Sequence, residues 1–204
     1  MIKWNVKKGM TALDIGANIG FYSLLLSRYV GPSGKVIAFE PEERNFSKLT
    51  KMTKKKKNIF IHRAACGATS GTLDLFLSND MNIDHQTYDS GENRHVQAVP
   101  CVALDDELTD NQNIGFIKID IQGYDYFAML GLQRIVRRSN ELTIIGEFWP
   151  YALKKAGVEP IEYINLLEKL GLKCHFFRPD LDPFNSDKVE NKYFYTDFYA
   201  LKQT

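Results

Sequence analysis

Apolar runs and amphipathic stretches alternate along the first third of the chain. Each apolar run is short enough for a buried strand, and each amphipathic stretch has apolar residues at helical spacing and ends near glycine or proline. The pattern predicts strand, helix, strand, helix and strand over Thr11–Ile15, Phe21–Tyr29, Lys35–Phe39, Glu42–Met52 and Asn58–His62. Connections of this length fit right-handed crossovers, so we expect a doubly wound parallel sheet.

The middle of the chain departs from this alternation. Gly71–Leu77 alternates as a half-exposed strand does, and Val96–Val102 could pair with it. The polar residues Ser78–His95 between them show no hydrophobic period. We therefore expect a β-hairpin with a long loop, an insert over about residues 71–102 of a single domain spanning 1–204.

The alternation then returns and completes the predicted sheet. Strands are expected at Ile114–Ile119, Leu142–Ile145, Leu172–Phe177 and Phe194–Leu201, and helices at Tyr124–Val136 and Ile161–Leu170. The last two strands follow one another without an intervening long helix, so the final strand is expected to be antiparallel. The prediction is an α/β, Rossmann-like, mostly parallel seven-stranded sheet.

Composition narrows the class of protein. The 204 residues are 44% hydrophobic, and 26 Lys and Arg against 25 Asp and Glu give a formal charge of +1. This balance argues against a general nucleic-acid coat or membrane-surface protein. There is no apolar run long enough for a membrane span and no signal peptide pattern at the start. The three cysteines lie far apart, which predicts reduced thiols and a cytoplasmic location.

The strongest motif joins the first strand to the first helix. Residues Leu13–Phe21 read D-x-G-x-N-x-G between the two elements. A dinucleotide loop requires G-x-G-x-x-G, whose second and third glycines would fall on Asn18 and Phe21 here, so an NAD-dependent oxidoreductase is disfavoured. The acid Asp14 would oppose a diphosphate but suit a cationic ligand.

A carboxylate follows the second strand. Glu40 could accept hydrogen bonds from both hydroxyls of a ribose, or it could be a surface residue that begins the next helix after Pro41. The glycine loop upstream favours the ribose interpretation.

Three segments together resemble a known family. The loop, Phe39-Glu40-Pro41 and Ile117–Gly123 resemble class I S-adenosylmethionine-dependent methyltransferases, and within them the FkbM family, many of whose members methylate hydroxyl oxygens of sugars or natural products. The resemblance covers about Ala12 to Glu147. It implies S-adenosylmethionine as cofactor and S-adenosylhomocysteine as product.

The resemblance also implies a cofactor site. The residues it places around the methionine part, the ribose and the adenine, or beside them, are Asp14, Gly16, Asn18, Gly20, Phe21, Glu40, Pro41, Ala64 and Ala65. Asp120 would lie beside the sulfonium and the acceptor. Where the family commonly has an acidic residue, this chain has Gln122, which weakens any scheme with two adjacent carboxylates.

Methyl transfer to a hydroxyl oxygen needs in-line geometry and a base. We rank Asp120 first and Glu147 second as bases because both end predicted parallel strands. His85 and His95 of the insert rank third, since either could be a solvated loop residue. No metal is expected.

Acceptor contacts are expected from Gln122, Tyr124, Trp149 and His85. The aromatic residues could stack on a sugar or belong to the core and rim. Lysines 48, 51 and 54–57 are expected to be a solvated helix end, and nucleic acid is an unlikely partner. The predicted function is O-methylation of a saccharide or small molecule. Methylation of nitrogen or a macromolecule, or an inactive cofactor-binding domain that serves a partner, stay open as alternatives, and the oligomeric state is unreadable from the sequence.

Overall fold

The computed structural model describes residues 2–78, 85–88, 93–108, 114–178 and 182–202. A seven-stranded sheet has the order β3-β2-β1-β7-β8-β10-β9, and a three-stranded sheet has the order β4-β6-β5. The strands are β1 (Thr11–Ile15), β2 (Lys35–Phe39), β3 (Ile59–His62), β4 (Ala65–Cys66), β5 (Gly71–Leu77), β6 (His95–Val102), β7 (Ile114–Ile119), β8 (Leu142–Phe148), β9 (Lys173–Phe176) and β10 (Thr196–Lys202).

The large sheet confirms the predicted fold class. Strands β1, β2, β3, β7 and β8 pair in parallel, and β10 runs antiparallel to both β8 and β9. Strand β7 lies at the centre and is buried at every position. Both faces of the sheet are therefore covered where β7 passes, as the apolar character of its sequence predicts.

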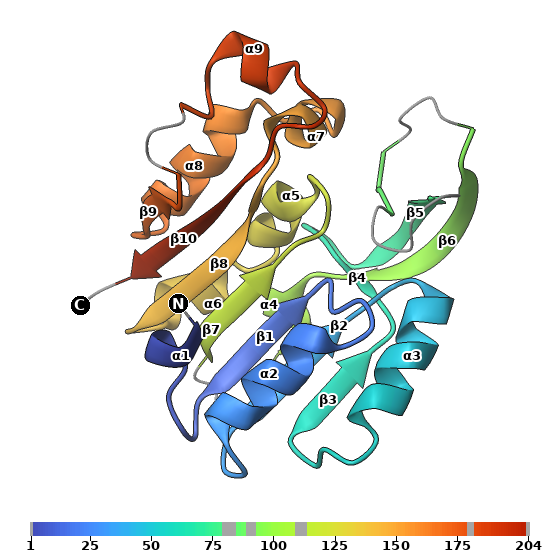
Figure 1. Cartoon of the computed structure of the whole chain (residues 1–204), viewed down its shortest axis with the longest axis vertical. Coiled ribbons are helices and arrows are strands. Elements are labelled where there is room, and N and C mark those ends of the chain that lie inside the picture. Colours follow the sequence, from blue (N-terminus) through green and yellow to red (C-terminus); the bar gives the residue numbers. More distant parts are fainter. Residues whose placement is uncertain (1, 79–84, 89–92, 109–113, 179–181, 203–204) are drawn as a thin grey trace.

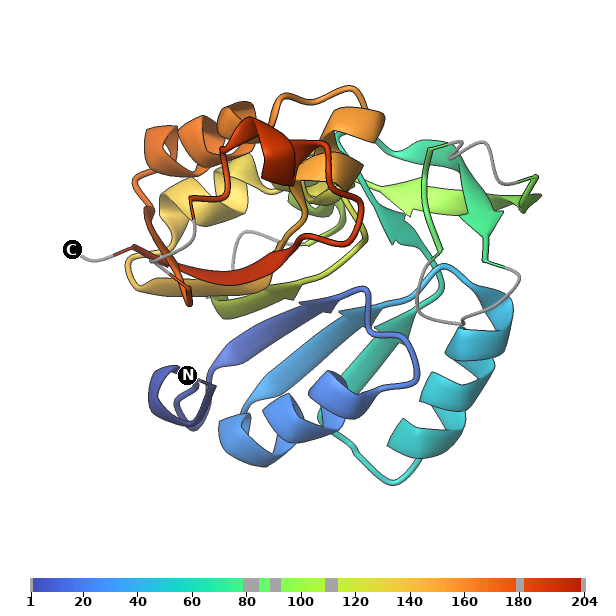
Figure 2. The same cartoon turned by 45° about the horizontal axis from the view of Figure 1, so that its top comes forward.

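Helices cover both faces of the sheet. Figure 2 shows α2 and α3 on one face and α5 to α8 on the other, while the small sheet lies beyond the carboxyl ends of β1, β2 and β7 (Figures 1 and 2). The helices are α1 (Ile2–Asn5), α2 (Phe21–Val30), α3 (Glu43–Thr53), α4 (Leu104–Glu107), α5 (Asp125–Leu130), α6 (Gln133–Arg138), α7 (Pro150–Lys155), α8 (Pro160–Lys169) and α9 (Ser186–Val189). None of the helices in the described part of the chain is long and apolar enough to cross a membrane.

Several elements differ from the prediction. The single helix expected over Tyr124–Val136 is two helices, α5 and α6, divided at Gly131. A Cβ at Gly131 would lie 2.1 Å from the carbonyl oxygen of Gly67, so the chain turns where it meets that segment. Strand β8 continues to Phe148 because β10 pairs along its whole length. Glu147 therefore lies within the paired part of the strand, near its carboxyl end.

The insert has the predicted hairpin. Strands β5 and β6 pair antiparallel from Gly71 with Cys101 to Leu77 with His95, and the short β4 adds to β6. Much of the loop expected over Ser78–His95 lies outside the described residues. Its described segment returns to the hairpin, because Gln86 and Phe76 exchange backbone hydrogen bonds of 2.7 and 3.0 Å.

Candidate active site

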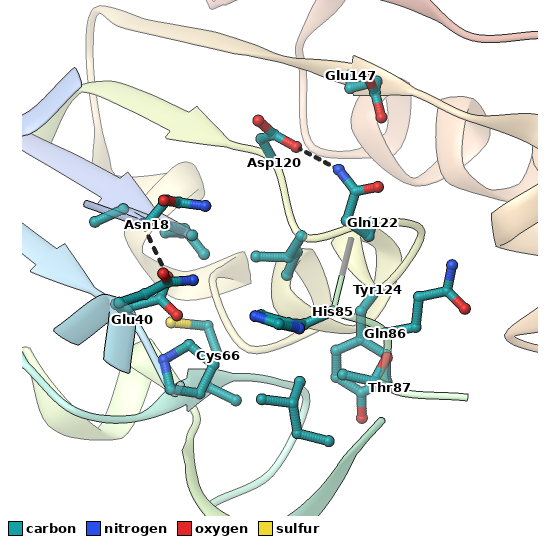
Figure 3. A pocket seen from close by; sticks show the side chains of 18 of the residues that line it. Asn18, Glu40, Cys66, His85, Gln86, Thr87, Asp120, Gln122, Tyr124 and Glu147 are labelled. Atoms are coloured by element: carbon teal, nitrogen blue, oxygen red, sulfur yellow. Dashed lines mark hydrogen bonds between the residues drawn. The ribbon is translucent and has the colours of Figure 1, made fainter. Parts of the chain in front are cut away.

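A cavity of about 890 Å³ opens at the carboxyl ends of β1, β2, β7 and β8. Open α/β sheets bind ligands at this edge. The β1–α2 loop, the ends of the strands, the insert and the segment before β10 all contribute to the lining. Figure 3 shows how side chains from the first three of these segments converge.

The glycine loop forms one wall. Gly16 has φ of 77° and Asn18 has φ of 49°, so the loop uses the left-handed conformations that glycine and asparagine tolerate. A Cβ at Gly16 would lie 2.2 Å from the carbonyl oxygen of Asp120. The backbone of the loop therefore rests directly against the end of β7, which leaves its cavity side open to a ligand.

Glu40 is a buried carboxyl group at the end of β2. It is 5% exposed, its Oε2 accepts a hydrogen bond from the Asn18 N–H at 2.8 Å, and its Oε1 accepts one from the Glu42 N–H at 3.0 Å. Burial raises the pKa of Glu40 to about 7 despite these donors. It does not cap the next helix, because Glu42 accepts the N-terminal hydrogen bonds of α3. The alternative of a surface helix-start residue is therefore excluded.

Two residues of the predicted cofactor site lie outside the lining. Asp14 is fully buried beneath the loop and accepts a 2.6 Å hydrogen bond from the Ser23 hydroxyl. Gly20 packs against helix α3, where a Cβ would lie 2.8 Å from Leu49 Cδ1. Glycine at this position therefore lets α3 approach the start of α2 closely. Asp14 and Gly20 therefore affect the shape of the loop without lining the cavity.

The other predicted cofactor residues line the cavity. Phe21 is 69% exposed at its mouth, and Pro41, Ala64 and Ala65 lie along the side nearest β2 and β4. The sequence did not single out Cys66 and Asn45, which line the same side. Cys66 is a free thiol that burial makes a poor acid, because burial raises its pKa well above the usual value. This wall is small and largely apolar.

Two carboxyl groups lie on neighbouring strands at the floor. Asp120 follows β7 and Glu147 lies in β8, next to Gly146, which pairs with Ile119. The Asp120 Oδ1 accepts a 3.1 Å hydrogen bond from Gln122 Nε2 (Figure 3). Burial, with Asp120, Asp125 and Asp197 nearby, raises the pKa of Glu147 to about 8. Glu147 is therefore a carboxyl group that exchanges its proton near neutral pH.

The four predicted acceptor residues also line the cavity. Gln122 has φ of 56°, and its side-chain amide donates to Asp120. The Trp149 indole N–H donates a hydrogen bond to the Lys192 carbonyl oxygen at 3.1 Å. Tyr124 stacks on Phe127, and burial raises its pKa.

His85 comes from the insert and is oriented by its backbone. Its Nδ1 accepts a 3.1 Å hydrogen bond from the Ser78 N–H. A neutral imidazole has one protonated nitrogen, so its proton is on Nε2 in this arrangement. The unprotonated nitrogen of His85 is therefore occupied by the Ser78 N–H, a poor arrangement for a base. The other candidate, His95, lies exposed at the start of β6 and is not part of the lining.

Sequence reasoning missed two charged residues near the floor, Lys118 and Asp197. Lys118 is 5% exposed within β7, and Asp197 comes from β10. A lysine inside an otherwise apolar strand was the available signal for the first. Among the residues that the structure describes, no three His, Cys, Asp or Glu side chains are grouped to hold a metal ion.

Residues 14–174 match the family profile described as the methyltransferase FkbM domain, which is well over half of the chain. The chain belongs to the FkbM methyltransferase family. No curated protein matches the sequence. The prediction made from the glycine loop, Glu40 and the Asp120 segment is thereby confirmed at the level of the family.

Solved structures show the same fold. An FkbM methyltransferase from Methylobacillus flagellatus KT is 14% identical with a TM-score of 0.59, and the match covers 94% of this chain and 43% of that one. Aeropyrum pernix fibrillarin with natively bound S-adenosyl-L-methionine is 16% identical, with a TM-score of 0.55 over 96% of this chain and 68% of that chain. An rRNA methylase from Streptococcus thermophilus is 14% identical, with a TM-score of 0.56 over 100% of this chain and 92% of that chain. This chain thus spans less than half the length of the FkbM structure.

S-adenosylmethionine, the cofactor that the sequence predicts for this FkbM chain, is the ligand bound in the fibrillarin structure of the same fold. The cavity fits it. Backbone of the glycine loop borders the cavity at Gly16 and Asn18, a buried carboxyl group ends β2, and apolar side chains line the far wall.

Proposed function

We propose that this FkbM chain transfers the methyl group of S-adenosylmethionine to a hydroxyl oxygen of a saccharide or another small molecule. The observation that carries the proposal is the carboxyl pair of Asp120 and Glu147 on adjacent strands at the floor of the cavity. A hydroxyl acceptor must lose a proton, whereas a neutral amine can attack without help. A carboxyl group whose pKa lies near 8 matches the first need.

The cofactor would lie along the glycine loop. Glu40 would accept hydrogen bonds from the ribose hydroxyls through the lone pairs that its backbone donors leave open. The loop backbone at Gly16 and Asn18 would border the methionine part, and Ala64 and Ala65 would border the adenine. Asp14 and Gly20 would act through the shape of the loop, since neither reaches the cavity.

The two carboxyl groups differ in how well each could accept a proton from the acceptor. Bound S-adenosylmethionine would supply an electrophilic methyl group, with S-adenosylhomocysteine as the product. Glu147 would accept the proton of the acceptor hydroxyl as its oxygen is methylated. Asp120 is less suited to that task because Gln122 and Lys118 occupy its oxygens, with Lys118 Nζ 3.7 Å from Oδ2. This reverses the order in which the sequence ranks the two.

Aromatic side chains support a ring-shaped acceptor. Trp149, Tyr151, Tyr193 and Tyr195 line the cavity beyond the carboxyl pair, and the two last are largely exposed. Such rings stack on the apolar faces of sugars, while their polar tips and Gln122 offer hydrogen bonds. Together with Glu147 they favour a small hydroxylated ring over a nucleic-acid strand.

Glu147→Gln tests the proposal. We expect methyl transfer to fall by about 10²–10⁴-fold, the contribution of a positioned base, because an amide cannot accept the proton. The measurement is transfer of radiolabelled methyl to a panel of mono- and disaccharides and phenols. S-adenosylhomocysteine affinity, measured by calorimetry, should stay at the wild-type value.

Glu107→Gln is the matched control, since Glu107 is exposed on α4 and far from the lining. Wild-type protein that methylates only amines or RNA would contradict the hydroxyl acceptor. Cofactor binding without transfer to any acceptor class would favour an inactive binding domain.

A further inference from the structure

Lys118 is a buried ammonium group beneath the glycine loop. It projects from β7 close to the carboxyl end of the strand, and its Nζ donates hydrogen bonds to the carbonyl oxygens of Gly16 at 2.6 Å and Ile15 at 3.4 Å. These carbonyls belong to the turn that lines the cofactor cavity. The β1–α2 loop is therefore held from below by a side chain of another strand.

The same ammonium faces carboxylates on two sides. Its Nζ lies 3.6 Å from Asp14 Oδ1 and 3.7 Å from Asp120 Oδ2, and the ring of Tyr22 covers it at 5.4 Å. Burial alone would lower the pKa of Lys118, but the attraction of Asp14, Asp120 and Glu40 outweighs it and raises the pKa. Lys118 is thus charged throughout the neutral pH range.

Lys118 also lies between two cavities. A second cavity of about 450 Å³ lies between α2, β8 and β10. Of the described residues that line both cavities, Lys118 alone is cationic; the full set is Phe21, Tyr22, Lys118, Asp120 and Glu147. A cation placed there acts on the cofactor loop and on both carboxyl groups at once.

We propose that Lys118 is a positioning residue that fixes the cofactor loop to Asp120 and supplies the positive charge that faces the carboxyl group of Glu147. The part that concerns Glu147 rests on the proposed function. The charged groups around Glu147 are Asp120 from β7, Asp125 from α5, Asp197 from β10 and Lys118 itself. Three of these are acidic, so loss of Lys118 leaves their repulsion unopposed.

Two consequences follow for a variant without the ammonium. Gly16 and Ile15 lose their donor, so the loop no longer has one fixed position and the cofactor binds less tightly. Because Lys118 lowers the pKa of Glu147, its removal raises that pKa further, and Glu147 holds its proton to higher pH.

Lys118→Met is the test, read out by calorimetry with S-adenosylhomocysteine and by carbon NMR titration of glutamate-labelled protein, with the Glu147 signal assigned through Glu147→Gln. We expect affinity to fall about tenfold or more, as for a lost hydrogen bond to a charged donor, and the Glu147 titration to move to higher pH. Lys35→Met is the matched control, because Lys35 is exposed at the amino end of β2, away from the cavity.

Methionine alone leaves Asp14 buried without its cation, which threatens folding. The double variant Asp14→Asn, Lys118→Met removes both charges together, and its fold is expected to survive. Weaker S-adenosylhomocysteine binding and a raised Glu147 titration in this variant support the inference. A folded double variant that matches the wild type in both readouts overturns it. Wild-type protein that does not bind S-adenosylhomocysteine would instead refute the cofactor assignment, which is a separate result.

Discussion

Identical carboxyl groups behave differently in this site because their neighbours differ. Glu40 and Glu147 are both desolvated and both have a raised pKa. The Glu40 carboxyl group receives two backbone N–H donors, whereas the Glu147 carboxyl group forms no hydrogen bond with the described residues. A fixed, hydrogen-bonded carboxyl group suits ligand binding, whereas one without such partners can receive a proton. The sequence placed both glutamates at strand ends but could not rank them, because burial depends on distant segments.

Asp120→Asn should move the pH dependence of methyl transfer. The negative charge of Asp120 raises the pKa of Glu147, so its removal lowers that pKa and shifts the rise of kcat/KM with pH toward lower pH. A pH profile of methyl transfer to a hydroxyl acceptor measures the shift. Asp74→Asn, at an exposed position of β5, is the control. A profile that stays in place, or moves to higher pH, would contradict the assignment of Glu147 as base.

At the scale of elements, the wall of the cavity at the carboxyl ends of the strands depends on close contact between the β1–α2 loop and the end of β7. The motif predicted a tight turn, and the positive φ of Gly16 agrees. What the motif could not predict is the partner, since the Asp120 carbonyl oxygen that excludes a Cβ comes from over a hundred residues later. The sequence did not predict the division between α5 and α6 for the same reason, because Gly131 contacts Gly67 in another distant segment.

Gly16→Ala should therefore weaken both stability and cofactor binding. The added Cβ meets backbone that cannot move aside cheaply, and an L-residue with φ of 77° is strained in any case. Gly157→Ala separates the two effects, because Gly157 has φ of 84° with nothing within 4 Å of the added Cβ. We expect a lower Tm for both variants, a larger loss for Gly16→Ala, and weaker S-adenosylhomocysteine binding for that variant alone. Equal losses from the two variants would show that the close contact contributes nothing.

For the whole molecule, hydrophobic periodicity predicted the sheet because the pattern of apolar and polar positions can be read from local sequence. It predicted less of the charge pattern. Lys118 and Asp197 lie in strands that read as apolar or half-buried, and their meeting with Asp120 and Glu147 requires the strand order β7-β8-β10. The methyltransferase family could be recognised from the sequence. The charge distribution at the floor of the cavity could be determined only from the assembled sheet.

These buried acids should make the whole fold less stable as pH rises. Glu40 and Asp125 have a pKa of about 7 and Glu147 of about 8, all above the values of the unfolded chain. The native state therefore binds more protons between about pH 4 and 8, and stability is lost across that range as pH increases. Thermal unfolding from pH 5 to 9 should show a falling Tm.

Asp125→Asn should flatten this fall. Its amide oxygen can still accept the hydrogen bond that Asp125 Oδ2 receives from the Gly123 N–H at 3.1 Å, and it cannot ionise. We expect a higher Tm than the wild type at pH 8 and little difference at pH 5. For a chain of this length, each kcal/mol gained in the free energy of unfolding raises Tm by about 2–4 °C. Asp74→Asn again serves as control. An equal gain at both pH values would indicate a packing effect instead.

The position of β10 between β8 and β9 has a consequence for how the enzyme is made. In the large sheet β9 pairs only with β10, although β9 emerges from the ribosome first. Strand β9 must therefore wait for β10 before it can join, so this edge of the sheet closes only after both strands have been made. Asp197 reaches the catalytic floor through the same event. The proposed protonation behaviour of Glu147 is thus complete only once β10 has been made and has paired with β8.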